Sequence, residues 1–536
     1  MAHLHVTDLA YAHPGGDTLF SDVSFKLPAG RHAGLIGVNG VGKSTLLRIL
    51  GDDIDAEEGD ASLGGRALWM RQDVGTGDGT VRELLLMGAP PRIRTAGLAL
   101  LACERELAAG DESAGVRLGT AIGEWSDLGG YELEGQWDAV CRRVAGGGLT
   151  EVGDRPSVTL SGGERKRLVL ELLFGSDAPI LLLDEPDNFL DIPAKRWLEE
   201  QIRKTRKTVL LISHDRELLA ACTDAIVTLE GNGAWVHDGS YATYATARAN
   251  RQKKLGDRLA QWNEEEKRLR ELVRVFKERA RYSPDLAKRA NAFETRWKRY
   301  VDAGPPPAPI TDKAISVRLQ GADSARKVVA LHDVEIDGLV RPFSDEIHFG
   351  ERVGLIGPNG SGKTHVMALL NGSTAPAAGR VVLGNRVSPG LFTQLNRRDD
   401  FAGRTLADIV EERTGAYETA MRGLARYDLQ HASNRMVETL SGGQRARLEI
   451  LCLELEGHNL LLLDEPTDNL DVESCEALEH ALDGFTGTVV AVSHDRAFLR
   501  RLDRFLLLDH DGRVTALPDV RSALEALERV SRTASA

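Results

Sequence analysis

Two unbroken apolar runs are the strongest pattern in the chain. "ILLLDE" (180–185) and "LLLLDE" (460–465) each end in two carboxylates. A short run of this kind is typical of a parallel strand that is buried on both faces. Ligands bind beyond the carboxyl ends of such strands in open sheets. The pattern therefore predicts an α/β fold with a binding site at each pair of carboxylates.

A different pattern lies between the two runs, from Thr246 to Tyr300. Apolar residues recur there at spacings of three and four, which places them on one face of a helix. Ser283 and Pro284 interrupt the run, and helices seldom continue through such a pair. We therefore expect two antiparallel helices packed as a coiled coil, with the tip at residues 281–285 and "VDAGPPPAP" (301–309) as an extended connector. The seam positions are Leu255, Leu259, Trp262, Leu269, Val273, Phe276, Leu286, Ala290, Phe293, Trp297 and Tyr300.

Four segments of the first half return in the second half, so the chain holds two copies of one nucleotide-binding module. The pairs are "GLIGVNGVGKST" (34–45) with "GLIGPNGSGKTH" (354–365), "LSGGERKRL" (160–168) with "LSGGQRARL" (440–448), "LLLDEPDNFLD" (181–191) with "LLLDEPTDNLD" (461–471), and "ISHDRELL" (212–219) with "VSHDRAFL" (492–499).

The displacement between the copies changes along the chain. It is 320 residues at the first segment and 280 at the other three, so the first module carries about 40 extra residues between Gln72 and Ser161. Their composition predicts a helix, a break at Gly110 and Gly115, and a second helix, at about 90–130. This insertion is either a plain surface addition or an arm that touches a partner.

Each first segment has the spacing of a phosphate-binding loop, G-x-x-x-x-G-K-[ST], between a predicted strand and a predicted helix. The glycines allow backbone N–H groups to wrap a phosphate, and the helix N-terminus adds positive charge. Lys43 and Lys363 are expected to reach the β- and γ-phosphates. Ser44 and Thr364 are expected to bind Mg²⁺ through their hydroxyls.

The carboxylate pairs complete the chemistry of ATP hydrolysis. Asp184 and Asp464 are expected to hold Mg²⁺ through water. Glu185 and Glu465 are expected to act as general bases on the attacking water.

LSGG beside these motifs, with one histidine after the next strand, resembles the ATP-binding-cassette (ABC) superfamily. That resemblance implies two composite ATP sites, each joining the phosphate loop of one module to the LSGG of the other, with His214 and His494 as catalytic residues. Gln72 and Gln394 join the Mg²⁺ and ATP ligands. The first site would use Gly37, Asn39, Gly40, Gly42, Lys43, Ser44, Thr45, Gln72, Ser441, Gly442 and Gly443; the second would use Gly357, Asn359, Gly360, Gly362, Lys363, Thr364, Gln394, Ser161, Gly162 and Gly163.

The two modules depart from the family pattern in different ways. Asp187 and Phe189 stand where the family usually has Thr and His. Tyr11 is expected to stack on adenine in the first module, and the second module has no matching aromatic. The two sites are therefore expected to differ in affinity or rate, although both keep the groups that hydrolysis needs.

Composition and charge then limit the function classes. The chain has 536 residues, a net charge of −13 and five dispersed cysteines without a CxxC pair. These features favour a reducing cytoplasm and argue against a zinc site or a disulfide framework. The N-terminus does not resemble a signal peptide, and no apolar run approaches the roughly 18 residues of a membrane span.

The predicted hairpin reverses the charge of the chain. Residues 246–300 contain 17 Lys and Arg against 8 Asp and Glu, a net of +9, which leaves −22 elsewhere. Aromatic residues lie among the basic ones, and this combination is typical of RNA binding, although a solvated spacer is the alternative. The candidate RNA-contacting residues are Lys277, Arg279, Arg281, Tyr282, Lys288 and Arg289.

Tandem cassettes joined by a basic hairpin, with an arm in the first, resemble the ABC-F family. The implied organisation is a first nucleotide-binding domain (1–243), a linker (244–303), a second domain (304–519) and a short C-terminal helix or tail (520–536). The implied function is that of a monomeric cytoplasmic ATPase that enters the ribosomal exit site, where its hairpin acts on P-site tRNA, ribosomal RNA and the peptidyl-transferase centre. "DEPTDNLD" and the short C-terminus resemble the antibiotic-resistance branch of actinobacteria.

Two other functions stay open from the sequence. The first is a housekeeping ABC-F factor that relieves stalled ribosomes. The second is the ATPase subunit of a drug exporter, which needs neither tethered cassettes nor a basic linker. A DNA repair or chromosome ATPase is disfavoured, because it would usually show zinc motifs or far longer coiled coils and neither is present, so we expect neither DNA nor a membrane as a partner.

Overall fold

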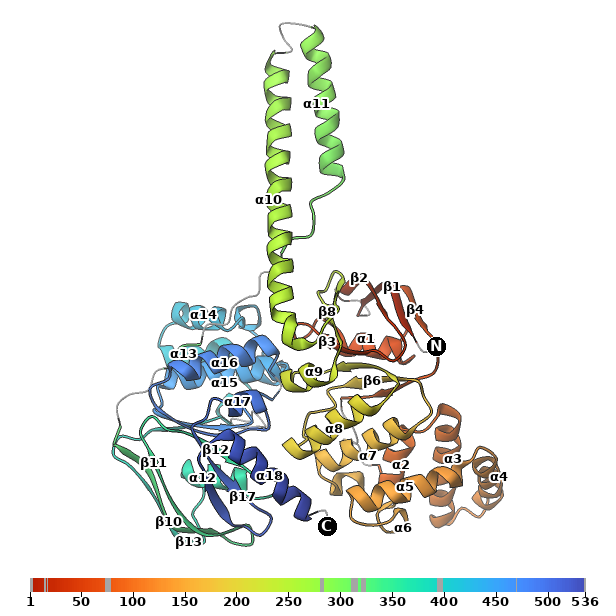
Figure 1. Ribbon diagram of the computed structural model, residues 1–536, viewed down its shortest axis with the longest axis vertical. Coiled ribbons are helices and arrows are strands. Elements are labelled where there is room, and N and C mark those ends of the chain that lie inside the picture. Colours follow the sequence, from red (N-terminus) through yellow and green to blue (C-terminus); the bar gives the residue numbers. More distant parts are fainter. Residues whose placement is uncertain are drawn as a thin grey trace. The chain divides into compact units, whose positions relative to one another are not determined.

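The computed structural model describes residues 3–13, 16, 18–72, 79–279, 284–309, 317–319, 324–392, 399–468 and 470–534. The chain forms two compact units. The first, Met1–Ser240 with Ala314–Ala536, contains both predicted nucleotide-binding modules, and the second, Tyr241–Lys313, contains the predicted hairpin (Figure 1).

A six-stranded sheet forms the centre of module 1. Its order is β5-β6-β7-β3-β8-β9, and every neighbouring pair is parallel except β8 and β9. All residues of β6 and β7 are buried, and the apolar run at 180–185 predicted this for β6. The strands are β3 (His32–Ile36), β5 (Ala67–Met70), β6 (Ile180–Asp184), β7 (Thr208–Ile212), β8 (Ala225–Leu229) and β9 (Ala234–His237).

A smaller antiparallel sheet completes the β part of module 1. Its strands are β1 (Leu4–Ala12), β2 (Thr18–Leu27) and β4 (Glu58–Leu63), in the order β2-β1-β4. Helix α1 (Lys43–Leu50) contributes Leu46, Leu47 and Leu50 to a core that also takes Leu35 and Leu9 from the two sheets. This core fixes the start of α1, and therefore the phosphate-binding loop, against the main sheet.

The remaining helices of module 1 include the predicted arm. Helices α3 and α4 pack on each other, and α4 also contacts α5 (Figure 1). Gly110, with φ of 96°, lies in the break between α3 and α4, but Gly115 lies inside the first turn of α4, so the break is shorter than predicted. The helices are α2 (Val81–Met87), α3 (Pro91–Ala108), α4 (Ala114–Asp127), α5 (Gly130–Val144), α6 (Leu149–Val152), α7 (Gly162–Gly175), α8 (Ile192–Lys204) and α9 (Arg216–Cys222).

Matching bridges in the two modules locate the insertion more closely. Thr80 bridges Pro156 in module 1, and Thr405 bridges Met436 in module 2. The first members of these pairs are 325 residues apart and the second members 280 apart, so 45 extra residues lie between Thr80 and Pro156. Helices α3 and α4 account for most of that difference.

Module 2 repeats the same two sheets. Their orders are β14-β15-β16-β12-β17-β18 and β11-β10-β13. The strands are β10 (Lys327–Ile336), β11 (Val340–His348), β12 (Arg352–Ile356), β13 (Ala378–Leu383), β14 (Pro389–Phe392), β15 (Leu460–Asp464), β16 (Thr488–Val492), β17 (Arg504–Leu508) and β18 (Val514–Leu517). The helices are α12 (Lys363–Leu370), α13 (Leu406–Thr414), α14 (Tyr417–Arg426), α15 (Gly442–Glu456), α16 (Val472–Gly484), α17 (Arg496–Leu499) and α18 (Val520–Ala534).

Helix α18 lies at the C-terminal end and packs on both modules. Its Ala523 and Leu527 belong to the core of module 2, and the same core includes Ile192 from α8 of module 1. Arg196 of α8 also pairs with Glu528 of α18. The C-terminal helix therefore contributes to the association of the two modules.

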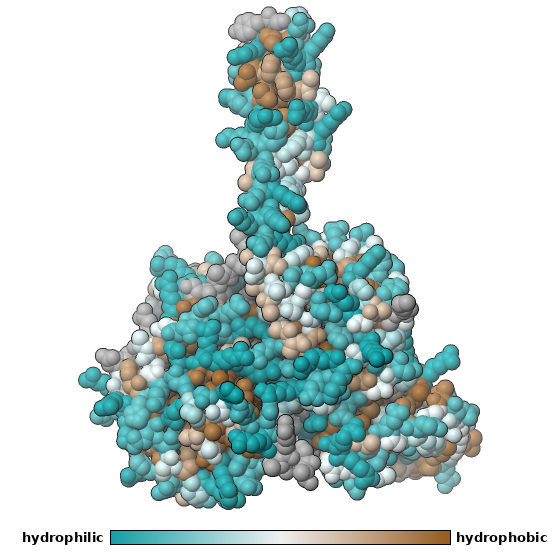
Figure 2. Space-filling model, viewed as in Figure 1, coloured by the Kyte–Doolittle hydropathy of each residue, from teal (hydrophilic) through white to brown (hydrophobic). Residues whose placement is uncertain are grey.

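The second unit is a hairpin of α10 (Tyr241–Arg279) and α11 (Pro284–Asp302). The rings of Trp262 and Tyr300 stack with centroids 5.4 Å apart, and those of Phe276 and Phe293 stack at 5.0 Å, so the helices run antiparallel. Figure 2 shows hydrophilic residues over most of the visible hairpin, with apolar residues gathered near the end where α10 stops and α11 starts. The predicted α/β fold, with two phosphate-loop modules joined by an antiparallel helical hairpin, is confirmed.

Candidate active site

The phosphate-binding loops connect β3 to α1 and β12 to α12. Gly42 and Gly362 precede the lysines and have φ of 102° and 96°, a left-handed conformation that glycine adopts without strain. Lys43 Nζ donates to the carbonyl oxygen of Gly37 at 2.8 Å, and Lys363 Nζ donates to that of Gly357, also at 2.8 Å. Each loop therefore folds around its own lysine.

The two candidate general bases share an unusual backbone conformation. Glu185 and Glu465 follow β6 and β15 directly and have φ of 48° and 49°. Residues other than glycine rarely adopt this conformation, and such outliers concentrate at functional sites. Each glutamate has this conformation where the buried strand ends, and the sequence motif alone gave no sign of it.

Site 1 is a cavity of about 450 Å³ that contains residues of both modules. Module 1 contributes its phosphate loop and the residues around Glu185, and module 2 contributes its LSGG segment. The predicted residues on its wall are Asn39, Gly40, Gly42, Lys43, Ser44, Thr45, Gln72, Glu185, His214, Ser441, Gly442 and Gly443.

Site 2 is a cavity of about 370 Å³ with the opposite arrangement. Here the phosphate loop comes from module 2 and the LSGG segment from module 1. The predicted residues on its wall are Asn359, Gly360, Gly362, Lys363, Thr364, Asp464, Glu465, His494, Ser161, Gly162 and Gly163.

The LSGG serines begin helices in both modules. Ser161 and Ser441 are the N-cap residues of α7 and α15, and each forms a capping box, with Glu164 and Gln444 respectively. The helix N-terminus adds backbone N–H groups and positive charge beside the serine. Each cavity therefore has one phosphate loop and one helix N-terminus from opposite modules.

Among the described residues, the two glutamates have different hydrogen-bond partners. Glu185 Oε2 accepts hydrogen bonds from Gln72 Nε2 and Asn188 Nδ2, both at 2.6 Å, and Glu185 Oε1 lies 3.7 Å from His214 Nε2. Glu465 Oε2 accepts a bond from the backbone N–H of His494 at 2.9 Å, and its Oε1 lies 3.4 Å from His494 Nε2.

Burial changes the proton affinity of these groups. It raises the pKa of Glu185 to about 7, with Asp184 and Asp187 adding to the effect, and raises the pKa of Glu465 to about 8, with Asp468 adding. A general base works best with a pKa near the working pH. Burial, reinforced by Lys43, lowers the pKa of His214 to about 4, so this imidazole is neutral at pH 7.

The segment after each glutamate reaches toward the opposite site. Burial lowers the pKa of Lys43, and Asp471 of module 2 is among the carboxylates that oppose this effect. Burial likewise lowers the pKa of Lys363, which Asp191 of module 1 opposes. Asp191 and Asp471 therefore act electrostatically on the phosphate-loop lysine of the other module.

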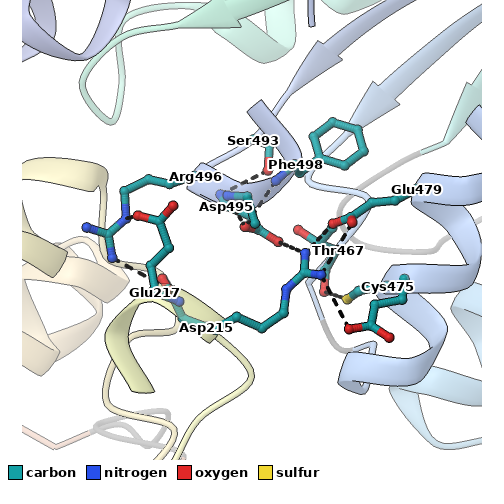
Figure 3. A network of polar contacts seen from close by, with 12 residues as sticks. Asp215, Glu217, Thr467, Cys475, Glu479, Ser493, Asp495, Arg496 and Phe498 are labelled. Atoms are coloured by element: carbon teal, nitrogen blue, oxygen red, sulfur yellow. Dashed lines mark hydrogen bonds and ion pairs between the residues drawn. The ribbon is translucent and has the colours of Figure 1, made fainter. Parts of the chain in front are cut away.

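Two reciprocal ion pairs join the modules next to the sites. Arg216 donates to Glu479 of module 2, and Arg496 donates to Glu199 of module 1. The two arginines occupy equivalent positions 280 residues apart, as do the two glutamates. In Figure 3, Arg496 also reaches Glu217 of module 1, with Nε 3.1 Å from Oε2. Sequence reasoning missed these pairs, although the repeat of the arginine in "SHDR" was a usable signal.

Several predicted site residues do not line site 1 or site 2. Gly37 and Gly357, which begin the loops, line neither cavity, and Asp184 is buried at the end of β6 without lining site 1. Tyr11 packs on Phe20, with ring centroids 6.3 Å apart, and His13 and Leu19 line site 1 instead. Gln394 lies outside the described residues.

The candidate RNA-contacting residues lie on the hairpin. Lys277, Arg279, Lys288 and Arg289 have exposed side chains. Lys277 Nζ pairs with Glu294 Oε2 across the two helices at 2.7 Å. Arg281 and Tyr282 lie outside the described residues.

Both modules match a family of known proteins. The ABC transporter family model matches residues 20–188 and 340–468, which is more than half of the chain. A Mycobacteroides abscessus protein named "Antibiotic resistance protein" is 44% identical, with 96% of this chain and 98% of that protein covered. This chain belongs to the ABC-F family.

Two further similarities cover most of this ABC-F chain. The tylosin resistance ATP-binding protein TlrC of Streptomyces fradiae is 32% identical, with 90% of this chain and 93% of that protein covered. The solved structure of an RNase-L Inhibitor has a TM-score of 0.60 at 19% identity, covers 98% of this chain and 93% of its own, and shares the fold.

Because this chain belongs to the ABC-F family, its activity is that of an ATPase. Its tandem cassettes bind ATP and hydrolyse it to ADP and phosphate. Within the described residues, no helix combines the length and apolar character that a membrane span requires.

Proposed function

We propose that this ABC-F protein binds the ribosome in its ATP state and uses the hairpin of α10 and α11 to dislodge antibiotics. The observation that most supports this proposal is the pair of composite sites. In each site, the phosphate loop of one module lies opposite the LSGG segment of the other. ATP in such sites would hold the modules together, and hydrolysis would release them, which gives a two-state clamp.

Each site has a full set of groups for hydrolysis. Lys43 and Lys363 would bind the β- and γ-phosphates, and Ser441 or Ser161 would meet the γ-phosphate from the opposite module. Glu185 and Glu465 would take a proton from the attacking water, which the raised pKa of each carboxyl favours.

The donor atoms fit Mg²⁺. In site 2, Thr364 Oγ1 lies 3.2 Å from Asp464 Oδ2, so a hydroxyl and a carboxylate oxygen converge below the phosphate loop. Mg²⁺ prefers such oxygen ligands. Thr364, Asp464 and Gln394 would hold it in site 2, and Ser44, Asp184 and Gln72 in site 1. When bound, Mg²⁺ neutralises charge that develops on the phosphates.

The hairpin supports RNA as the target. Its net charge of +9 lies in a chain whose other residues sum to −22, and its basic side chains are exposed on two helices that aromatic stacking holds together. Basic side chains bind phosphates, and structured RNA is recognised largely through its backbone. The resemblance to ABC-F proteins directs this surface to P-site tRNA and the peptidyl-transferase centre.

Two relatives support resistance over housekeeping. Proteins named for antibiotic resistance and for tylosin resistance match this chain along more than 90% of their own lengths. We therefore expect expression in a susceptible bacterium to raise the inhibitory concentration of at least one macrolide, lincosamide, streptogramin, pleuromutilin or phenicol. Rescue of stalled ribosomes without any change across this panel would favour the housekeeping factor.

The first test is ribosome binding. A chain with Glu185→Gln and Glu465→Gln should co-sediment with ribosomes in ATP and low salt, and lose that binding as salt rises. Absence of the chain from the ribosome pellet at low salt would contradict the proposal.

The second test isolates the hairpin. Replacing Arg279, Arg281, Lys288 and Arg289 together with Ala should weaken ribosome binding while ATP hydrolysis without ribosomes stays unchanged. A matched control replaces Arg251, Lys253, Lys254 and Arg258, which lie on α10 far from its C-terminal end. An equal loss in both variants would assign the effect to total charge, and no loss in either would make the hairpin a spacer.

A further inference from the structure

One buried lysine faces both ATP sites. Lys195 lies near the start of α8, is 8% exposed, and lines both cavities. Lysine is rarely buried unless a charge or hydrogen-bond partner compensates it. Its counterpart 280 residues later, Cys475, lines site 1 alone. The lysine therefore breaks the symmetry of the two modules at their interface.

The contacts of Lys195 join the two histidine loops. Its Nζ donates to the carbonyl oxygen of His494 in module 2 at 3.2 Å and lies 3.2 Å from Asp215 Oδ2 in module 1. Asp215 follows His214 and caps α9 by accepting bonds from two backbone N–H groups. One ammonium group thus bonds the loop of each histidine that faces a candidate general base.

Four carboxylates keep the ammonium charged despite its burial. Asp215 has the largest effect, followed by Asp187, Asp495 and Asp468, and together they raise the pKa of Lys195 above its ordinary value. Asp187 occupies the position where the ABC family usually has Thr. Module 1 therefore has an additional carboxylate, Asp187, together with Lys195, whose positive charge compensates it. Both residues lie at the interface of the two modules.

Cys475 cannot form the equivalent link. Its Sγ donates to carbonyl oxygens of its own module, those of Thr467 at 3.7 Å and Leu470 at 3.9 Å. Burial raises the pKa of this thiol, so it stays neutral. The connection between the histidine loops is therefore made from the module 1 side by Lys195.

We propose that Lys195 is a positioning residue that couples the two ATP sites by tying the His214 loop to the His494 loop when the modules are closed. This inference rests on the composite ATP sites of the proposed function. It adds a route by which the occupancy of one site changes the turnover of the other.

The test measures the coupling as the ratio of two turnover numbers of site 2, one with ATP in site 1 and one without. Site 2 turnover is measured in Glu185→Gln, where site 1 holds ATP, and in Lys43→Ala, where site 1 binds it poorly. With Lys195 present, we expect the two turnover numbers to differ by about fivefold or more. In the same pair of chains carrying Lys195→Met, the ratio should fall to nearly one.

Matched variants separate positioning from folding. Lys195→Arg should restore most of the ratio, because it keeps both the charge and the donor, and Cys475→Ala should leave the ratio unchanged. Lys195→Gln keeps a donor for His494 without the charge, so it gives an intermediate ratio and serves if the Met variant does not fold. Thermal unfolding without nucleotide reports folding separately.

Two results would overturn the inference. One is a ratio near one in the parent pair, and the other is a ratio that Lys195→Met and Lys195→Gln leave unchanged. If the chain did not form the composite sites, Glu185→Gln and Glu465→Gln would not each remove the activity of one site and leave that of the other. That result differs from both results above, so it separates failure of the proposed function from failure of this inference.

Discussion

Sites 1 and 2 contain the same reactive groups but support them differently. Among the described residues, which do not include Gln394, side-chain amides of Gln72 and Asn188 hold Glu185 in site 1, and the backbone N–H of His494 holds Glu465 in site 2. Lys195 and Cys475 occupy equivalent positions of the two modules but differ in type, as do Asp187 and Thr467. The difference indicates that duplication preserved the atoms that act on ATP, while the groups that orient them diverged.

This divergence matters because orientation controls catalysis as strongly as reactivity does. A general base must lie within hydrogen-bond reach of the proton that it removes. A side-chain support can be lost by one substitution, whereas a backbone N–H survives almost any substitution. Site 1 is therefore expected to be the more sensitive site to mutation of supporting residues.

The largest effect should come from the general bases. Glu185→Gln with Glu465→Gln should lower ATP hydrolysis by about a thousandfold, because neither site can then deprotonate water. Phosphate release measures this, with the exposed Glu58→Gln as the control. Each single variant should keep hydrolysis at the other site, at a rate that the coupling between the sites sets, so complete loss in one single variant would show that only one site hydrolyses ATP.

The next effect concerns the reciprocal arginines. Arg496→Ala leaves Glu199, which is 6% exposed, without its partner, and losing one member of a buried ion pair costs about 3–5 kcal/mol. We expect a matching loss of ATP affinity, measured by equilibrium binding in the non-hydrolysing double variant. Arg216→Ala should cost less, because Arg501 still lies 3.3 Å from Glu479.

A charge exchange tests this interpretation of the arginines. Arg496→Glu combined with Glu199→Arg should recover part of the affinity that either change alone removes. Equal losses for Arg216→Ala and Arg496→Ala would contradict the expected difference between the two sides.

A smaller effect is expected when the hydrogen bond that holds Glu185 is removed, and it should be confined to site 1. Gln72→Ala removes the 2.6 Å bond to Glu185, so site 1 turnover, measured in Glu465→Gln, should fall about tenfold. Site 2 turnover, measured in Glu185→Gln, should stay unchanged because Gln72 does not line that cavity. An equal fall in both would indicate that Gln72 acts on closure of the whole clamp.

The smallest effect concerns the adenine end of site 1. The structure puts His13 and Leu19 on the wall while Tyr11 packs on Phe20. We expect His13→Ala to raise the KM of site 1 about threefold and Tyr11→Leu to raise it by less than about twofold. The reverse order, measured with Glu465→Gln to silence site 2, would support stacking of Tyr11 on adenine.

The sequence was most informative where a short segment carries a function alone. The loop from Gly37 to Ser44 and the run that ends at Asp184 have local signatures, because their chemistry depends on consecutive residues. Amphipathic spacing likewise predicted the seam of the hairpin, where Leu269 and Ala290 are buried and Trp262 stacks on Tyr300.

The sequence was less informative where a residue acts through a distant partner. Lys195 has no local motif, and Glu199 looks like one more charged residue on a helix. Their roles follow from contacts with His494 and Arg496, about 300 residues away. The stacking of Tyr11 on adenine stays a prediction, because this partly buried aromatic packs against the core of module 1 and does not line site 1.

The sequence by itself determined the fold class, the two modules, the phosphate loops and the reversed charge of the hairpin, because each depends on neighbouring residues or on a repeat. Only the tertiary structure decided which glutamate has which support, where the extra helices begin and which ion pairs join the modules. Those features depend on backbone angles and on side chains that meet only after folding, and a linear pattern does not specify such contacts.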